Sequence, residues 1–126
     1  MSKPWIAALG LSLLASPVVA KDVTRCGWYA NPTPGNHWIS DADSTWYLST
    51  QGGPEAPGWM DLPSESFDFE RPGYWVRTNG YYGYGCACIT GRFGSFESGD
   101  VLRVTSMKAL PLSKCEADPA LPGAEE

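Results

Sequence analysis

The sequence predicts a small, mainly β protein: an antiparallel sheet or open barrel of about five strands, stapled by two disulfides. The 126-residue chain contains 14 Gly and 11 Pro, and 13% of its residues are aromatic. This composition is typical of short strands joined by many turns. After the N-terminal region, no segment repeats apolar residues every 3.6 positions as an amphipathic helix does. Four cysteines in so short a chain complete the pattern of a disulfide-stapled fold.

Two candidate strands lie in the first half of the chain. Residues 24–30 form the first, which ends at the Asn31-Pro32-Thr33-Pro34-Gly35 run because proline lacks a backbone donor. Residues 46–50 alternate Trp, Leu and Thr with Tyr and Ser, which is a period-two pattern. Residues 51–71 contain three prolines and two adjacent glycines. They predict a long irregular loop with one helical turn near residues 64–69.

Three more strands are predicted in the second half. Residues 74–78 form one strand, and Asn79-Gly80 predicts a two-residue turn into the next strand at residues 84–90. Residues 91–100 form a loop before the last strand at residues 101–110. The pattern therefore favours a small antiparallel sheet or open barrel whose short strands are joined by long irregular loops.

The N-terminal residues 1–20 have the pattern of a secretory signal peptide. Lys3 precedes an apolar stretch at residues 5–19, and small residues at positions 18 and 20 precede Lys21. A transmembrane anchor is the alternative, but the stretch is broken by Pro17 and is shorter than the ~20 residues that span a bilayer. We expect a mature chain that begins at Lys21, is exported to the periplasm or secreted, and is not inserted in a membrane.

The remaining chain divides into one domain and a tail. Residues 21–116 are predicted to form the disulfide-stapled β domain, and residues 117–126 a flexible acidic tail. Removal of Lys3 with the signal changes the formal charge from −5 to −6. An acidic chain without a basic run lacks the electrostatic footprint that nucleic acid requires, so no nucleic-acid partner is expected.

The cysteines Cys26, Cys86, Cys88 and Cys115 all lie in the mature chain, and their number is even, as a disulfide framework requires. A bond between Cys86 and Cys88 is disfavoured because their side chains leave one strand in the same direction, with Cα atoms about 6.5 Å apart. We therefore expect each of them to bond Cys26 or Cys115. The order of the two pairings stays open.

Two other interpretations of the cysteines are weaker. A Cys-x-Cys pair is a possible redox centre, since neighbouring thiolates exchange disulfides, but the sequence has no C-x-x-C at a helix start. A four-thiolate zinc site needs reduced sulfur and paired C-x-x-C spacing. Structural disulfides are the favoured interpretation, and we expect neither a metal ion nor a cofactor.

Catalytic motifs are lacking in the sequence. His37 is the single histidine, and Asp41 and Asp43 precede the second strand two positions apart. Asp41 or Asp43 is interpreted as the cap of a turn, because a calcium site takes roughly six to eight oxygens from a longer run of ligands. No phosphate-binding loop, zinc-protease pair or dinucleotide fingerprint is present. An enzyme stays as an alternative only if His37, Asp41 and Asp43 meet in one pocket.

Aromatic residues provide the candidate binding surface. The segment from Asn79 to Gly85 places Tyr81 and Tyr82 beside a tight turn, where rings suit recognition of a partner. The other interpretation is that the aromatics fill the core of a small β domain. Alternation puts Tyr82 and Tyr84 on the face of Cys86 and Cys88, which we expect to be the buried face, and leaves Tyr81 exposed. The complete set of candidate binding residues is Asn79, Tyr81, Tyr82, Trp38, His37, Asp41 and Asp43.

Several segments together identify a family. They are Arg25-Cys26-Gly27-Trp28, Asn31-Pro32-Thr33-Pro34-Gly35-Asn36, Trp38 to Trp46, Gln51-Gly52-Gly53-Pro54-Glu55, Thr78-Asn79-Gly80, Tyr82-Gly83-Tyr84-Gly85-Cys86-Ala87-Cys88, and Leu110-Pro111-Leu112 to Cys115. Together they resemble the bacterial domain-of-unknown-function family 4087 over nearly the whole mature chain. The resemblance implies a small exported protein of Gram-negative bacteria and brings no catalytic residues. The chain departs from the pattern mainly after Gly91, where Phe93 and Phe96 extend a loop.

The function hypothesis is a non-enzymatic periplasmic binding module. Its expected partner is another protein, an exported toxin among them, or an envelope polymer. An inhibitor- or immunity-type role is suggested by analogy with other small, rigid, stapled domains. The alternative is a small periplasmic enzyme or a thiol-disulfide protein that uses the Cys86-x-Cys88 pair.

Overall fold

A computed structural model describes residues 21–124 of the chain. The predicted signal peptide at residues 1–20 lies outside the described residues. Among the helices of the described part, none is both long and apolar enough to cross a bilayer.

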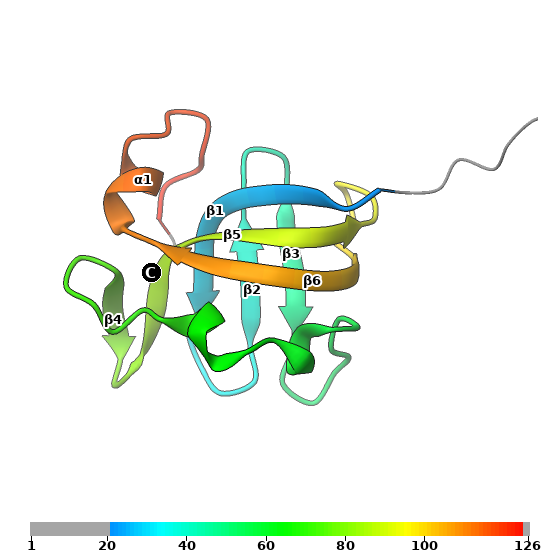
Figure 1. The fold of residues 1–126 in the computed structure, drawn as a ribbon, viewed down its shortest axis with the longest axis horizontal. Helices are drawn as coiled ribbons and strands as arrows, with labels where there is room; N and C mark the ends of the chain where they lie inside the picture. Colours follow the sequence, from blue (N-terminus) through cyan, green and yellow to red (C-terminus); the bar gives the residue numbers. More distant parts are fainter. Residues whose placement is uncertain (1–20, 125–126) are drawn as a thin grey trace, which may run out of the picture.

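Six strands form one open antiparallel sheet (Figure 1). They are β1 (Val23–Asn31), β2 (His37–Ser40), β3 (Thr45–Ser49), β4 (Trp75–Asn79), β5 (Tyr82–Phe93) and β6 (Val101–Leu110). Three short helical segments complete the fold: the 3-10 turns η1 (Trp59–Asp61) and η2 (Ser64–Phe67), and the helix α1 (Leu112–Glu116). The predicted mainly β class with two disulfides is confirmed.

The long strand β5 organises the sheet, whose order is β3-β2-β1-β5-β4. One edge of β5 pairs with β1 from Gly83 to Gly91. The other edge pairs first with β4, up to Gly85, and then with β6 from Cys86 onward. The strands β4 and β6 thus share the second edge of β5, and the β4–β5 hairpin forms one end of the molecule (Figure 1).

Two details differ from the sequence prediction. The four-residue strand β2 was not expected, because breaker residues flank it and it is too short to show a period. The tight turn consists of Gly80 and Tyr81 rather than Asn79 and Gly80, since Asn79 pairs with Tyr82. A bulge between Arg77 and Asn79 shifts the register by one residue and moves the turn with it.

The core has two parts, one on each face of β5. The larger contains Ala87 and Ile89 from β5 and ten further buried residues: Tyr29, Ile39, Trp46, Leu48, Trp59, Phe69, Val101, Val104, Met107 and Ala109. The smaller contains Trp28, Cys86 and Cys115. We expected the face of Cys86 and Cys88 to be the buried one, but it carries the smaller cluster. The larger core lies on the opposite face because the segment between β3 and β4 covers that side.

Two disulfides join the strands as the sequence predicted, each using one cysteine of the Cys-x-Cys pair. Cys26 bonds Cys88 at directly opposed positions of β1 and β5. Cys86 bonds Cys115 and attaches α1 to the sheet. The segment after Cys115, predicted to be flexible, contacts the domain at Pro122, whose carbonyl accepts a hydrogen bond from Trp28 Nε1 at 3.1 Å.

Candidate binding cleft

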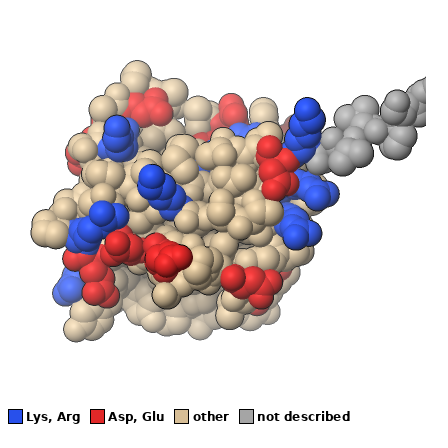
Figure 2. Space-filling model, viewed as in Figure 1, with Lys and Arg blue, Asp and Glu red and all other residues tan. Residues whose placement is uncertain are grey.

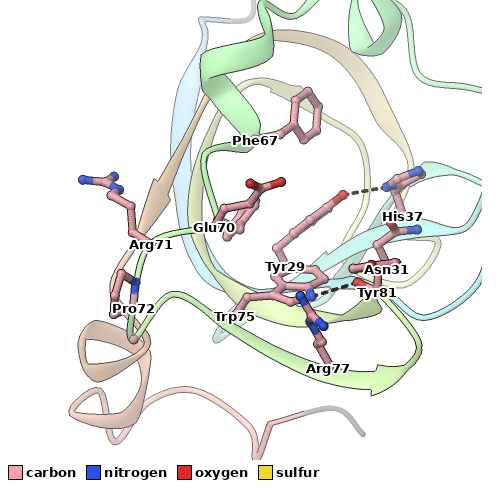
Figure 3. A pocket seen from close by; sticks show the side chains of 12 residues that line it. Tyr29, Asn31, His37, Phe67, Glu70, Arg71, Pro72, Trp75, Arg77 and Tyr81 are labelled. Atoms are coloured by element: carbon pink, nitrogen blue, oxygen red, sulfur yellow. Dashed lines mark hydrogen bonds between the residues drawn. The ribbon is translucent and has the colours of Figure 1, made fainter.

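A cleft of about 590 Å3 opens beside the β4–β5 hairpin (Figure 3). This volume lies within the range of about 300–1,000 Å3 that ligand sites occupy. Five aromatic side chains line it: Tyr29, Phe67, Phe69, Trp75 and Tyr81. The polar lining residues include Asn31, His37, Glu70, Arg71 and Arg77. Aromatic rings beside polar groups that can fix the orientation of a ligand are features of ligand sites.

The aromatic floor follows from the sheet register. Tyr29 of β1 and Trp75 of β4 both lie opposite Gly85 of β5, so the three residues form one row across three strands. A Cβ atom at Gly85 would lie 2.9 Å from the Phe69 ring. The glycine therefore leaves the space in which Phe69 stacks on Tyr29, with ring centroids 5.3 Å apart, and packs against Trp75 at 5.0 Å.

The deepest polar group of the cleft is the Tyr29–His37 pair. Tyr29 Oη lies 2.6 Å from His37 Nδ1, and the two rings stack with centroids 6.0 Å apart. Burial raises the pKa of Tyr29 above its ordinary value, and burial lowers the pKa of His37. Both shifts favour the neutral forms, because a low-dielectric site disfavours charge. The pair is therefore an uncharged hydrogen-bonded unit near pH 7.

The rim of the cleft carries one exposed tyrosine and the charged groups. Tyr81 is 80% exposed, and its carbonyl accepts a hydrogen bond from Trp75 Nε1 at 3.1 Å. The Arg77 guanidinium lies 4.6 Å from the Tyr81 ring centroid, a cation–π distance. Arg71 instead points away from the cleft in Figure 3 and pairs with Asp68 at 3.2 Å. Arg77 is thus the arginine that faces the opening.

The predicted binding residues fall into separate groups. Tyr81 and His37 both line the cleft. Asn79 and Tyr82 belong to the same hairpin but are not among the lining residues. Trp38 packs against the Tyr47 ring with centroids 6.2 Å apart.

The aspartates lie at the other end of β2 from His37. Asp41 follows His37 by four positions along extended strand, which is a span of roughly 13 Å. The constellation of His37, Asp41 and Asp43 on which the enzyme alternative depended is therefore not brought together. Asp41 instead lines a shallow hollow with Asp43, away from the aromatic cleft.

Asp41 caps the turn after β2, as the sequence analysis proposed. Its Oδ1 accepts hydrogen bonds from the backbone N–H groups of Asp43 and Ser44, both at 2.9 Å, and its Oδ2 accepts one from Arg25 at 2.9 Å. Burial alone would raise the pKa of Asp41, but these hydrogen bonds, together with one from Trp46 Nε1, hold that pKa below its ordinary value. Asp43 also pairs with Arg25, at 3.0 Å.

The sequence analysis did not identify Phe67, Phe69 and Trp75 as lining residues. Phe67 and Phe69 fell in the segment read as an irregular loop, and Trp75 in a strand whose partner face was unknown. The one local signal was Gly85, a strand residue without a side chain inside an aromatic-rich segment.

The family model described as "Protein of unknown function (DUF4087)" matches residues 20–122. The chain belongs to this family. The resemblance derived from the Gly-Tyr-Gly-Cys-Ala-Cys segment is thus confirmed, and in this member of the family that segment supplies both Gly85 and the two bridging cysteines of β5. No match was found among curated proteins or among solved structures.

Proposed function

We propose that the protein is a periplasmic binding module that recognises another envelope or exported protein through the aromatic cleft. The observation that carries the proposal is Tyr81, an 80% exposed tyrosine on the rim of a cleft lined by four further aromatic residues. Tyrosine and tryptophan beside arginine are the residue types that contribute most binding energy at protein interfaces. The two disulfides support export, because such bonds persist in oxidising compartments.

The groups in the cleft favour binding over catalysis. His37 and Tyr29 satisfy each other and have pKa values shifted toward their neutral forms. Charges elsewhere on the molecule add no strong steering field to the face drawn in Figure 2, where basic and acidic side chains are interspersed. Recognition would therefore depend on shape and aromatic contact at the cleft rather than on a long-range field.

A photo-crosslinking experiment tests the proposal. The full chain is expressed with its own N-terminal segment in a bacterium that encodes a protein of this family, and benzoylphenylalanine replaces Tyr81. The matched control carries the same group at Phe96, which is 55% exposed in the loop between β5 and β6, at the opposite end of the sheet (Figure 1). We expect discrete adducts with an envelope protein from position 81 and none from position 96. Equal adducts from both positions, or none from position 81, would overturn the proposal.

A further inference from the structure

We infer that the partner contributes an extended peptide segment, which pairs with the free edge of β4 and inserts an aromatic side chain into the cleft. In this arrangement a carboxylate two residues away meets Arg77. The inference rests on the proposed function and specifies what occupies the same cleft.

The two ends of the sheet differ in how their edges are used. At the β3 end, residues of neighbouring loops form hydrogen bonds with the backbone of the edge strand. Tyr47 N donates to Gly99 O at 3.0 Å, and Ala56 N donates to Leu48 O at 2.8 Å. At the β4 end, β5 is the one strand of the described residues that pairs with β4. Figure 1 shows no strand beyond β4 on this side. A free strand edge presents N–H and C=O groups that can pair with an added strand.

The free edge and the cleft are built from the same strand. Trp75 and Arg77 lie two positions apart on β4 and both line the cleft. A strand added to β4 would turn every second side chain toward that face. The spacing of Trp75 and Arg77 therefore predicts two anchoring side chains in the ligand, also two positions apart.

The lining decides what the two anchors are. The cleft is walled by aromatic rings and holds about 590 Å3, which accommodates one large ring with room for solvent. Arg77 forms no ion pair with any carboxylate of the described residues, whereas Arg71 is already paired with Asp68. The second anchor is therefore an acidic side chain at Arg77. Glu70 on the same lining disfavours a second acidic residue in the ligand.

A displayed heptapeptide library, selected on the full chain purified from the periplasm with both disulfides formed, tests the inference. We expect enriched peptides to carry one aromatic and one acidic residue two positions apart. Their affinity, measured by fluorescence anisotropy of synthetic copies, should fall at least tenfold for Arg77→Glu. The matched charge reversal Arg103→Glu, on the exposed side of β6, should leave it unchanged. No enriched peptide, or equal binding by the two variants, overturns the inference.

Backbone methylation separates strand addition from simple insertion of a side chain. Alternate N–H groups of an added strand point to β4, so N-methylation at those positions should reduce affinity at least tenfold, and methylation at the intervening positions should not. If neither register matters, strand addition is refuted. If neither register matters but position 81 still gives adducts in the crosslinking experiment, the peptide mode alone is refuted and the proposed function stands. The absence of adducts from position 81 in that crosslinking experiment refutes the proposed function itself.

Discussion

Gly85→Ala tests whether a single missing side chain shapes the cleft. The added methyl group would lie 2.7 Å from the Tyr74 carbonyl oxygen and 2.9 Å from two atoms of the Phe69 ring. Phe69 is 7% exposed and packs against both Tyr29 and Trp75, so these rings restrict its movement away from the added methyl group. Overpacking of this kind costs about 1–3 kcal/mol, and the lower backbone entropy of unfolded alanine recovers about 0.4–1 kcal/mol. We therefore expect a net loss of about 1–2 kcal/mol in the free energy of unfolding.

Urea denaturation followed by tryptophan fluorescence measures this loss. The control is Gly123→Ala, where an added Cβ meets no atom within 4 Å, and whose effect should stay within about 0.5 kcal/mol. A double-mutant cycle with Phe69→Ala identifies the cause, because removal of the ring should relieve about 1 kcal/mol of the penalty. If Gly85→Ala is as stable as the wild type, or costs the same without the Phe69 ring, our account of the cleft floor is wrong.

Three further predictions concern the rest of the molecule. The pKa of Asp41 is lower in the folded state than in the unfolded state. The stabilisation that its carboxylate provides is therefore present above the unfolded pKa of about 3.9 and is lost as pH falls through the folded value. The urea midpoints of the wild type and Asp41→Asn should differ most near neutral pH and converge in acid. Mild reduction followed by alkylation should label Cys26 and Cys88 before Cys86 and Cys115. The reason is that Cys26 is exposed, whereas Cys86 and Cys115 are 1% and 4% exposed. Peptide mapping that finds the reverse order of labelling would contradict the prediction. Tyr81→Ala should change the free energy of unfolding by less than about 0.5 kcal/mol, because its ring is exposed, and a larger loss measured by urea denaturation would place the ring in a structural role.

Local patterns predicted most of the fold and little of the cleft. The period-two pattern of residues 46–50, the breaker residues after residues 24–30 and the Asn-Gly pair each predict a strand or hairpin from neighbouring residues alone. The structure has β3, β1 and the β4–β5 hairpin there, with the turn one residue later than predicted. The exposure of Tyr81 followed from its place beside the turn and is confirmed. The strand β2 was not predicted, because four residues between breaker residues are too few to show a period-two pattern.

The cleft depends on contacts between residues distant in sequence. Phe69 comes from the irregular segment and stacks on Tyr29, forty positions earlier in the chain. Which aromatic rings meet is set by the path of that segment across the sheet, and no local spacing encodes this path. The sequence therefore showed a surplus of aromatics and left open whether they were core or surface. They are both, since Tyr29 is 3% exposed and still forms a wall of the cleft.

The Gly-Tyr-Gly-Cys-Ala-Cys segment connects the cleft to the disulfides through one strand. Gly85 faces the aromatic floor, and Cys86, the next residue, faces the other side and holds α1 through Cys115. The backbone N–H of Leu112, at the start of α1, donates to Gly73 O at 2.8 Å, and Gly73 lines the cleft just before β4. The Cys86–Cys115 bond thus attaches α1 to the sheet, and α1 contacts the segment that leads into β4, the strand of Trp75 and Arg77. A rigid, pre-formed cleft reduces the entropy that a ligand must lose on binding. The disulfide that joins α1 to the sheet therefore also supports the strand on which the proposed site is built.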